Sequence, residues 1–383
     1  MQELFIGLMS GTSLDGVDGV LVDLSRDFKV LAHHSAPFPA RLKNELLALN
    51  LAGENELHRA SLCANEIAHI YAQVCHALLE QTGYGAHDIS AVGAHGQTVR
   101  HRPAAYDGTG YTIQLNNPAL LAERTGIRVC ADFRTRDIAA GGQGAPLVPA
   151  FHSSLFQDKD STVCVLNLGG ISNLSVLPPS SHNPDNQNLD VIGFDCGPAN
   201  CLMDEWCFVH TGHAYDESGA WAAQGQCVQA LLNLFLDTPY FNAPAPKSTG
   251  RDLFNMDWLK SKLNEFRAQY PKIDNPSAVD IQATLAMLCV QPCVMSIMRY
   301  ASTASRLIVC GGGALNQHVM DSLQKALPNI RVSPSTEYGL PPLQVEAAAF
   351  AWLAKRCVYG ETASLKSVTG AQGARILGAI YQA

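Results

Sequence analysis

A polar turn close to the N-terminus holds the first residues whose types and spacing could do chemistry. The stretch 7–18, GLMSGTSLDGVD, places glycines, hydroxyls and two carboxylates between two apolar runs. Glycine lets the backbone approach a ligand, and amide and hydroxyl groups donate hydrogen bonds, so such a turn can hold phosphate oxygens. Asp15 and Asp18 would repel a bare phosphate, which predicts either a divalent cation beside them or a structural Asx-turn. An ordinary polar turn remains an equal alternative.

Two further glycine clusters follow apolar strands. The stretch 162–177, TVCVLNLGGISNLSVL, has the same pattern as the first stretch, a polar glycine turn between two apolar runs, with Asn167, Gly169 and Gly170 at its turn. Gly311–Gly313 and Asn316 come after the apolar run RLIVC, where a flat backbone would suit a nucleotide's base or ribose. A plain strand-to-helix turn is an equal alternative there. The chain has neither a G-x-x-x-x-G-K-[ST] motif nor a G-x-G-x-x-G motif after a strand, so any nucleotide site would be built from hairpins.

One carboxylate stands out as a candidate general base. Asp195 in VIGFDCGPANCLMD ends an apolar strand, and the residues after it are typical of a helix start. A carboxylate at a strand end can accept a proton from a substrate or from water. An Asp that caps the following helix is the alternative.

Two segments are unusually polar for their place, GAHGQTVRHRP (93–103) and ADFRTRDIAAGGQGAPLVP (131–149). Arginine and amide donors would suit a polyhydroxylated, anionic small molecule. A solvent-exposed role is the alternative for each arginine, and hydrogen-bonded histidines are favoured over ligands for His95 and His101. The polar residues concerned are Gln97, Thr98, Arg100, His101, Arg102, Arg134, Arg136 and Asp137.

The elements that must position these residues follow from apolar periodicity. Two successive regions each begin with a strand, a polar glycine turn and a second strand, which predicts a duplicated domain, with coincidence between two hairpins as the alternative. Strands are expected at 4–9, 19–23, 28–36, 91–94, 111–115, 128–131, 191–195 and 306–310. Two more strands are expected within 162–177, one ending at 168 and the other at 177. Helices are expected at 57–79, 118–125, 200–210, 256–270, after Pro276 and at 343–359.

Bulk composition narrows the class of protein. The chain has 383 residues, 47% of them hydrophobic and 16% charged, which predicts a globular protein of two domains. A net charge of −8 disfavours nucleic acid or an anionic membrane as the main partner. The N-terminus carries no signal-peptide pattern, so we expect a cytoplasmic location. The uncharged run 281–298 is interpreted as a buried helix, and the twelve scattered cysteines as free buried thiols rather than metal ligands.

Taken together, these segments resemble the anhydro-N-acetylmuramic acid kinases. The matching motifs are GLMSGTSLDGVD, GAHGQTVRHRP, ADFRTRDIAAGGQGAPLVP, NLGGISN, GFDCGPANCLMD, GGGALN and GLPPLQVEAAAFAWLA, and they cover nearly the whole chain in the family's order. The resemblance implies an α/β fold of two RNase H-like (actin-like ATPase) domains, with mixed β-sheets flanked by helices around an interdomain ATP cleft. We expect the domains at 1–140 and 141–383; whether the C-terminal segment packs on the first is left open.

The resemblance also implies a reaction: ATP-dependent conversion of 1,6-anhydro-N-acetylmuramic acid and water to N-acetylmuramic acid 6-phosphate, in peptidoglycan recycling. Asp195 would be the general base, and Asp15 would lie nearest a magnesium ion, through water. The sugar would be held by Gln97, Thr98, Arg136, Asp137 and Glu346. The nucleotide would be held by Gly11, Thr12, Ser13, Leu14, Asp15, Gly16, Val17, Asp18, Asn167, Gly169, Gly170, Gly311, Gly312, Gly313 and Asn316.

Some details stay open within the resemblance. Glu337 lies close to Glu346 in the sequence and competes with it for the sugar role, and Cys196 and Ala199 stand where the family commonly has other small residues. Pro178–Asn188 is interpreted as a surface loop, and the family's habit suggests a homodimer. A kinase for an ordinary sugar and a chaperone-like ATPase are the alternative functions.

Overall fold

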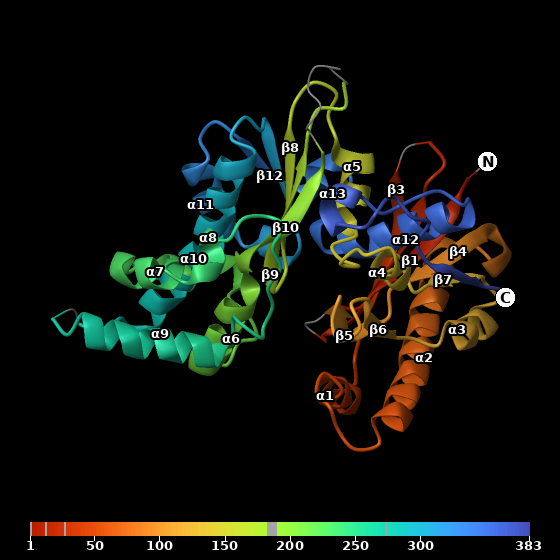
Figure 1. The fold of residues 1–383 in the computed structure, drawn as a ribbon, viewed down its shortest axis with the longest axis horizontal. Helices are drawn as coiled ribbons and strands as arrows, with labels where there is room; N and C mark the ends of the chain where they lie inside the picture. The colour runs from red at the N-terminus through yellow and green to blue at the C-terminus, as the bar shows by residue number, and fades with distance from the viewer. Residues whose placement is uncertain (1, 12–13, 27, 182–189, 273) are drawn as a thin grey trace. The chain divides into compact units, whose positions relative to one another are not determined.

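The computed structural model describes residues 2–11, 14–26, 28–181, 190–272 and 274–383. The predicted nucleotide contacts at Thr12 and Ser13, and most of the predicted surface loop 178–188, lie outside the described residues. The described chain forms two compact units, Met1–Leu155 with Gln344–Ala383, and Phe156–Leu343 (Figure 1).

A six-stranded mixed sheet forms the centre of the first unit. Its order is β13-β7-β4-β1-β2-β3, in which β1, β2 and β3 pair antiparallel while β1, β4 and β7 run parallel. The bounds are β1 Leu4–Met9, β2 Gly16–Asp23, β3 Lys29–Pro37, β4 Ile89–Ala94, β7 Val129–Ala131 and β13 Ala379–Tyr381. A separate hairpin pairs β5 (Gln97–Pro103) with β6 (Gly110–Leu115).

Glycines in the strands of this sheet let one helix pack closely on each face. A Cβ at Gly7 would lie 1.9 Å from the Ala347 carbonyl oxygen, so the backbone of α12 (Val345–Val358) packs directly on that face. A Cβ at Gly19 would instead meet Val74 of α2 (Glu56–Thr82). Gly7 pairs with Val20, and neighbouring strand residues point to opposite faces, so α12 and α2 cover opposite faces.

The second unit repeats this arrangement with different strands. Its five-stranded sheet has the order β10-β9-β8-β11-β12, in which β8, β9 and β10 pair antiparallel while β8, β11 and β12 run parallel. In each sheet the first strand (β1 or β8) is central, the second and third strands lie on one side of it, and the fourth and fifth lie on the other. This shared order confirms the predicted duplication and the α/β class of two RNase H-like domains. The bounds are β8 Val163–Leu168, β9 Ile171–Leu177, β10 Ile192–Pro198, β11 Arg306–Cys310 and β12 Arg331–Pro334.

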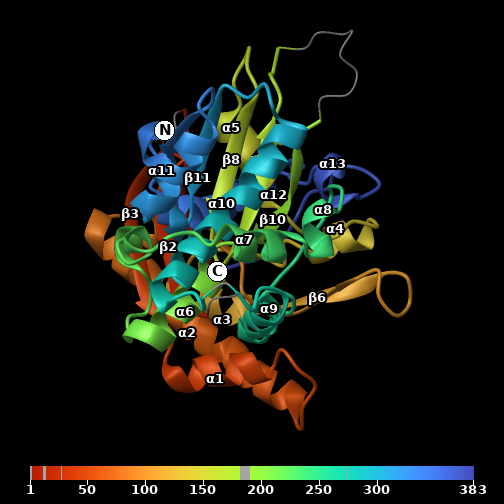
Figure 2. The same cartoon turned by 90° about the vertical axis from the view of Figure 1, so that its left-hand side faces the viewer.

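A long apolar helix, α10 (Ala278–Tyr300), packs against β9 and β10 of the second unit. Figure 2 shows this helix in front of the sheet that contains β8 and β10. Ile281, Leu285 and Leu288 on this helix are at most 5% exposed and belong to the unit's hydrophobic core. In the described part of the chain α10 is the one helix long and apolar enough to span a membrane, but most of it is buried in the protein. The prediction of a buried helix over 281–298 is confirmed.

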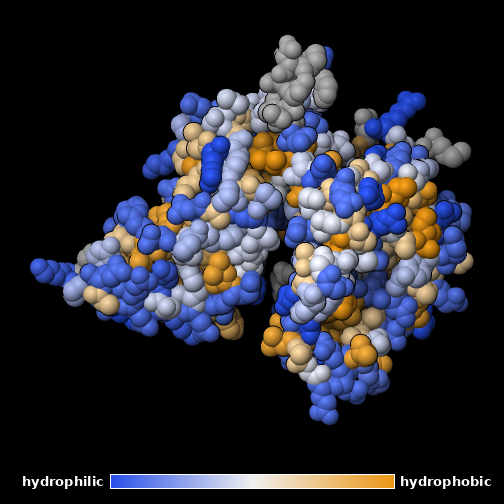
Figure 3. All heavy atoms as spheres, viewed as in Figure 1, coloured by the Kyte–Doolittle hydropathy of each residue, from blue (hydrophilic) through white to orange (hydrophobic). Residues whose placement is uncertain are grey.

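The remaining helices are short or lie at the surface of one unit. In the first unit they are α1 Ala40–Ala48, α3 Pro118–Thr125, α4 Thr135–Ala139, α5 Val148–Phe156, which crosses the unit boundary, and α13 Lys366–Thr369. In the second they are α6 Asn200–Thr211, α7 Gln229–Leu236, α8 Pro239–Asn242, α9 Met256–Gln269 and α11 Gln317–Ala326. On the face drawn in Figure 3, polar side chains cover most of the surface and apolar ones form small groups. Eleven of the twelve cysteines are buried, and all twelve are free thiols.

The division of the chain differs from the predicted boundary at residue 140. The first unit extends to Leu155 and takes back Gln344–Ala383, so the predicted second domain 141–383 is too long at both ends. The reason lies in long-range packing. The helix α12 fits against glycines of β1 and β4, and β13 pairs antiparallel with β7.

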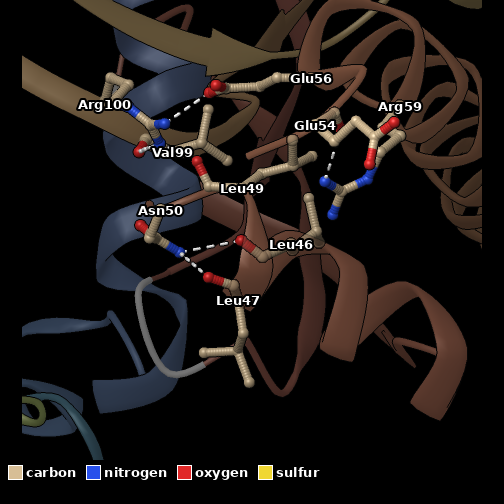
Figure 4. A network of polar contacts seen from close by, with 9 residues as sticks. All are labelled: Leu46, Leu47, Leu49, Asn50, Glu54, Glu56, Arg59, Val99 and Arg100. Atoms are coloured by element: carbon tan, nitrogen blue, oxygen red, sulfur yellow. Dashed lines mark hydrogen bonds and ion pairs between the residues drawn. The ribbon is translucent and has the colours of Figure 1, made fainter. Parts of the chain in front are cut away.

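Arg100 is a structural residue of the first unit rather than a solvent-exposed one. Its guanidinium donates to the Leu49 carbonyl and forms an ion pair with Glu56 (Figure 4). These contacts fasten the β5–β6 hairpin to the segment between α1 and α2, and Asn50 there donates to the last carbonyls of α1.

Candidate functional site

The predicted nucleotide residues of the second unit converge at one end of its sheet. The β8–β9 turn contains Gly169 and Gly170, and Asn167 at the end of β8 pairs with Cys310 of β11, directly before Gly311. A Cβ at Gly311 would lie 2.4 Å from the Asn167 Oδ1 atom. Because β8 and β11 are parallel neighbours, their carboxyl ends bring the two glycine clusters side by side.

Four members of this group, Gly169, Gly170, Gly311 and Asn316, have an observed local role. Gly311 has a φ of 78°, which is the left-handed region that glycine tolerates. The carbonyls of Gly169 and Gly170 accept hydrogen bonds from the amides of Asn200 and Ala199. Asn316 is the N-cap of α11, and its side chain accepts a hydrogen bond from the Val319 amide at 3.1 Å. The cluster is therefore a shelf lined mostly by backbone atoms, in which Gly311 also allows the close approach of Asn167.

The Asp195 carboxylate lies on β10 in the same unit, paired with Asn173 and followed by a bulge in the ladder. Its Oδ2 atom accepts hydrogen bonds from the Ser248 hydroxyl and the Thr249 amide, each at 3.0 Å. Within the described part of the chain no donor contacts Oδ1, which leaves that oxygen available to accept a proton. Burial raises the pKa of Asp195, while the Thr249 and Ser248 hydrogen bonds lower it.

The alternative role for Asp195 as a helix cap is not observed. The N-cap of α6 is Ala199, and no side chain caps it. The Tyr240 hydroxyl donates to the Asp195 carbonyl at 2.7 Å, and the Asp195 amide donates to the Lys247 carbonyl at 3.0 Å. The backbone on both sides of this carboxylate is therefore held in place.

Sequence reasoning missed the segment Lys247–Thr249 that holds Asp195. The stretch PKSTGRD is short and polar and reads as an ordinary loop. The only available signal was a hydroxyl pair beside a glycine, which is common in loops without function.

Replacing Ser248 by alanine tests the environment of Asp195. The Ser248 hydroxyl stabilises the ionised carboxylate, so its removal raises the pKa of Asp195 further. We expect the acid limb of the kcat/KM profile to move to higher pH while the alkaline plateau changes little. Ser248→Thr keeps the hydroxyl and is the matched control. An acid limb that stays in place in Ser248→Ala would show that Asp195 does not control it.

The opening turn lies between β1 and β2 of the first unit. Leu14 is buried with a φ of 59°, and its amide donates to the Gly11 carbonyl at 3.2 Å. The Asp15 carboxylate is well exposed and contacts the Lys43 ammonium at 3.2 Å. Asp18 accepts a hydrogen bond from the Ser35 hydroxyl on β3. Gly16 and Val17 begin β2.

Of the predicted sugar residues, Gln97 contacts this turn directly, and the charge of Asp18 in the turn affects Glu346. Gln97 is buried, its Nε2 atom donates to the Gly11 carbonyl at 3.2 Å, and its Oε1 atom is buried without a partner among the described residues. The Thr98 hydroxyl accepts from Gln114 at 3.2 Å. Burial and the nearby charge of Asp18 raise the pKa of Glu346, and Arg134 lowers it.

The other two predicted sugar residues have contrasting environments on α4. Arg136 is exposed. Asp137 is fully buried, and its carboxylate oxygens accept hydrogen bonds from the Gly144 amide and the Thr369 hydroxyl, each at 2.8 Å. Asp137 therefore holds the glycine-rich loop 141–144 against the returning C-terminal segment. Glu337, the competitor of Glu346, is ion-paired with Arg331 in the second unit.

A polar hollow of the first unit lies at the ends of β4 and β7. Its volume is about 240 Å³, and its lining includes His95, Gln114, Asn116, Asp132 and Thr135. A larger, more open hollow beside Gln2 and Arg26 contains none of the predicted site residues. The prediction of hydrogen-bonded histidines is confirmed for His95, which contacts Ser10 and Arg134, and for His101, which contacts Thr112.

The family model and the curated relatives that match this sequence carry one family description. A family model described as anhydro-N-acetylmuramic acid kinase matches residues 3–383. A protein of Albidiferax ferrireducens with that name is 57% identical over 396 residues, and the match covers 100% of both chains. Its namesake in Variovorax paradoxus is 56% identical, covering 100% of this chain and 99% of the other. Among solved structures, a ROK family glucokinase from Streptomyces griseus has 14% identity and a TM-score of 0.41, covering 92% of this chain and 99% of its own.

Proposed function

The chain belongs to the anhydro-N-acetylmuramic acid kinase family, and we propose that it converts 1,6-anhydro-N-acetylmuramic acid, ATP and water to N-acetylmuramic acid 6-phosphate and ADP. This step belongs to peptidoglycan recycling and amino sugar catabolism. The observation that carries the proposal is the Asp195 carboxylate, held through one oxygen by Ser248 and Thr249 while the other oxygen has no donor among the described residues.

The hydrolytic half of the reaction uses Asp195 as general base. The carboxylate takes a proton from water, and the water oxygen bonds to the anomeric carbon of the sugar. The bond between that carbon and the bridging oxygen breaks, and the bridging oxygen becomes the 6-oxygen of the open sugar. The buried position of Asp195 raises its pKa, which makes it a stronger base than an exposed aspartate.

The second half transfers the phosphoryl group. The freed 6-oxygen attacks the γ-phosphorus of ATP in line, and ADP leaves. Orientation of the two reacting groups lowers the barrier, because little covalent chemistry is required of the protein. The overall balance is one anhydro-sugar, one ATP and one water consumed for one sugar phosphate, one ADP and one proton, the proton that Asp195 takes from water and then releases to solvent.

The residues that hold the substrates are part of the proposal. Gly11, Leu14, Gly16, Val17 and Asp18, with Thr12 and Ser13, would bind the phosphates. The shelf of the second unit, formed by Asn167, Gly169, Gly170, Gly311, Gly312, Gly313 and Asn316, would bind the nucleotide as well. The sugar would contact Gln97, Thr98, Arg136 and Glu346, and Asp137 would act through the loop 141–144 that it holds.

Magnesium is the proposed companion of ATP. The exposed carboxylate of Asp15 fits such an ion held through water, since hard oxygen donors suit magnesium. Among the residues that the structure describes, the Lys43 ammonium is the one group in contact with this carboxylate. When bound, the ion would neutralise phosphate charge. We also propose a cytoplasmic homodimer without nucleic-acid or membrane partners, a state that sedimentation of the purified protein tests.

The test of the function is to weigh the product. Purified protein is incubated with ATP, magnesium and either 1,6-anhydro-N-acetylmuramic acid or N-acetylmuramic acid. The expected product of the anhydro-sugar is heavier by a phosphoryl group plus one water. A gain of the phosphoryl group alone would instead identify an ordinary sugar kinase. ATP hydrolysis without any phosphorylated sugar would support the ATPase alternative.

A further inference from the structure

The end of β1 is fastened by a closed set of hydrogen bonds before the proposed phosphate turn begins. Ser10 is 1% exposed, and its hydroxyl donates to the Gly96 carbonyl at 3.1 Å. That donation uses the only proton of the hydroxyl, so the Tyr71 hydroxyl must donate to Ser10 over their 3.0 Å contact. The Tyr71 oxygen in turn accepts from the Gly96 amide at 3.0 Å. The position of Ser10 is thereby determined by residues of α2 and of the β4–β5 connection.

His95 adds a further link, and its tautomer follows from its partners. Arg134 donates to the His95 Nε2 atom from two nitrogens, at 3.2 and 3.0 Å. A guanidinium only donates, so Nε2 is unprotonated and the proton lies on Nδ1. Nδ1 therefore donates to the Ser10 carbonyl at 3.3 Å. Burial and the charge of Arg134 hold the pKa of His95 well below its ordinary value, so the ring is neutral.

Arg134 extends this link to the proposed sugar residues. Its Nη1 atom donates to the Gly144 carbonyl at 2.8 Å, and the Gly144 amide donates to the buried Asp137 carboxylate. Burial lowers the pKa of Arg134 to about 10, while Glu346 and Asp137 raise it through their charges. One chain of hydrogen bonds thus runs from Asp137 through Gly144, Arg134 and His95 to Ser10, and Glu346 acts on Arg134 through its charge alone.

We propose that His95 is a positioning residue that couples sugar binding to nucleotide binding, through Arg134 on one side and Ser10 on the other. The inference rests on the proposed function, because it takes the turn 11–18 as the phosphate turn and the surroundings of Arg134 as the sugar side. A sugar that fixes the position of Arg134 then fixes the Ser10 carbonyl, through His95. Such coupling is reciprocal, so each ligand increases the affinity of the protein for the other.

Two substitutions separate the halves of the link. His95→Asn keeps an amide donor near the place of Nδ1 and removes the acceptor for Arg134. His95→Gln keeps an acceptor near the place of Nε2 and removes the donor to Ser10. A purely structural role would make the two variants alike, whereas the proposed role gives them opposite defects.

The experiment measures binding of a non-hydrolysable ATP analogue by calorimetry, with and without 1,6-anhydro-N-acetylmuramic acid, and of the sugar alone. In the wild-type protein we expect the sugar to increase the affinity for the nucleotide analogue about tenfold. Both variants are expected to lose this gain. His95→Gln should weaken nucleotide binding but not sugar binding, and His95→Asn should weaken sugar binding but not nucleotide binding. Tyr71→Phe, which loosens Ser10 without touching Arg134, should resemble His95→Gln.

Matched controls are His87→Asn and His87→Gln, at an exposed histidine of the same unit. Retention of the full tightening in both His95 variants would overturn the inference, as would identical losses of both ligands in the two variants. If the wild-type protein phosphorylates the anhydro-sugar but the sugar leaves nucleotide affinity unchanged, the inference fails and the proposed function stands. If the wild-type protein neither binds nor phosphorylates the sugar, both fail.

Discussion

Replacing Asp195 by asparagine is expected to lower kcat about 10³-fold while nucleotide affinity stays within about twofold of wild type. Asparagine has the same shape and can still accept the Ser248 and Thr249 hydrogen bonds through its amide oxygen. It cannot take a proton from water, so the step that opens the anhydro ring loses its base. Steady-state turnover of the anhydro-sugar and calorimetric binding of an ATP analogue measure the two effects separately.

The matched control is Asp237→Asn, at an exposed aspartate that follows α7 in the same unit. This variant should turn over at the wild-type rate. Wild-type turnover in Asp195→Asn would remove Asp195 from the mechanism. Loss of nucleotide binding together with turnover would point to a structural role for the carboxylate.

Replacing Gly7 by alanine is expected to destabilise the protein by about 3 kcal/mol, the upper part of the range for overpacking a core. The added Cβ would lie 1.9 Å from the Ala347 carbonyl oxygen and 2.6 Å from the Ala351 amide nitrogen. Both contacts are with backbone atoms of α12, so the helix must move away from the sheet. Urea unfolding followed by circular dichroism measures the loss.

Gly93→Ala should have a similar effect, because its Cβ would lie 2.0 Å from the Phe350 carbonyl oxygen on the same helix. The double variant should lose less than the sum of the two, since one displacement of α12 relieves both contacts. Gly53→Ala, whose Cβ would meet only the end of the Arg59 side chain, is the control and should keep wild-type stability. Unchanged stability of Gly7→Ala would contradict the close packing of α12.

Local patterns were enough to predict many elements and the kinds of residue at the site. The strands β1 and β11 and the helix α3 have the predicted bounds, because their apolar spacing and flanking breakers are contained in adjacent residues. The strand β5 was missed, since its residues 97–103 are mostly polar and lack apolar alternation. The three-residue β13 was missed because all of it is exposed and its partner strand lies about 250 residues earlier in the chain.

The sequence by itself determined which functional groups are present: glycine turns that can bind phosphate, a carboxylate at a strand end, and the motifs that place the chain in its family. Only the tertiary structure decided how those groups are held. The contact of Ser248 and Thr249 with Asp195 spans more than 50 residues, and the link from Arg134 through His95 to Ser10 spans 39 and then 85. The return of α12 to the first sheet depends on glycines more than 250 residues before it. Such contacts are selected by the packing of the whole unit, because no local preference of the separate segments favours one distant partner over another.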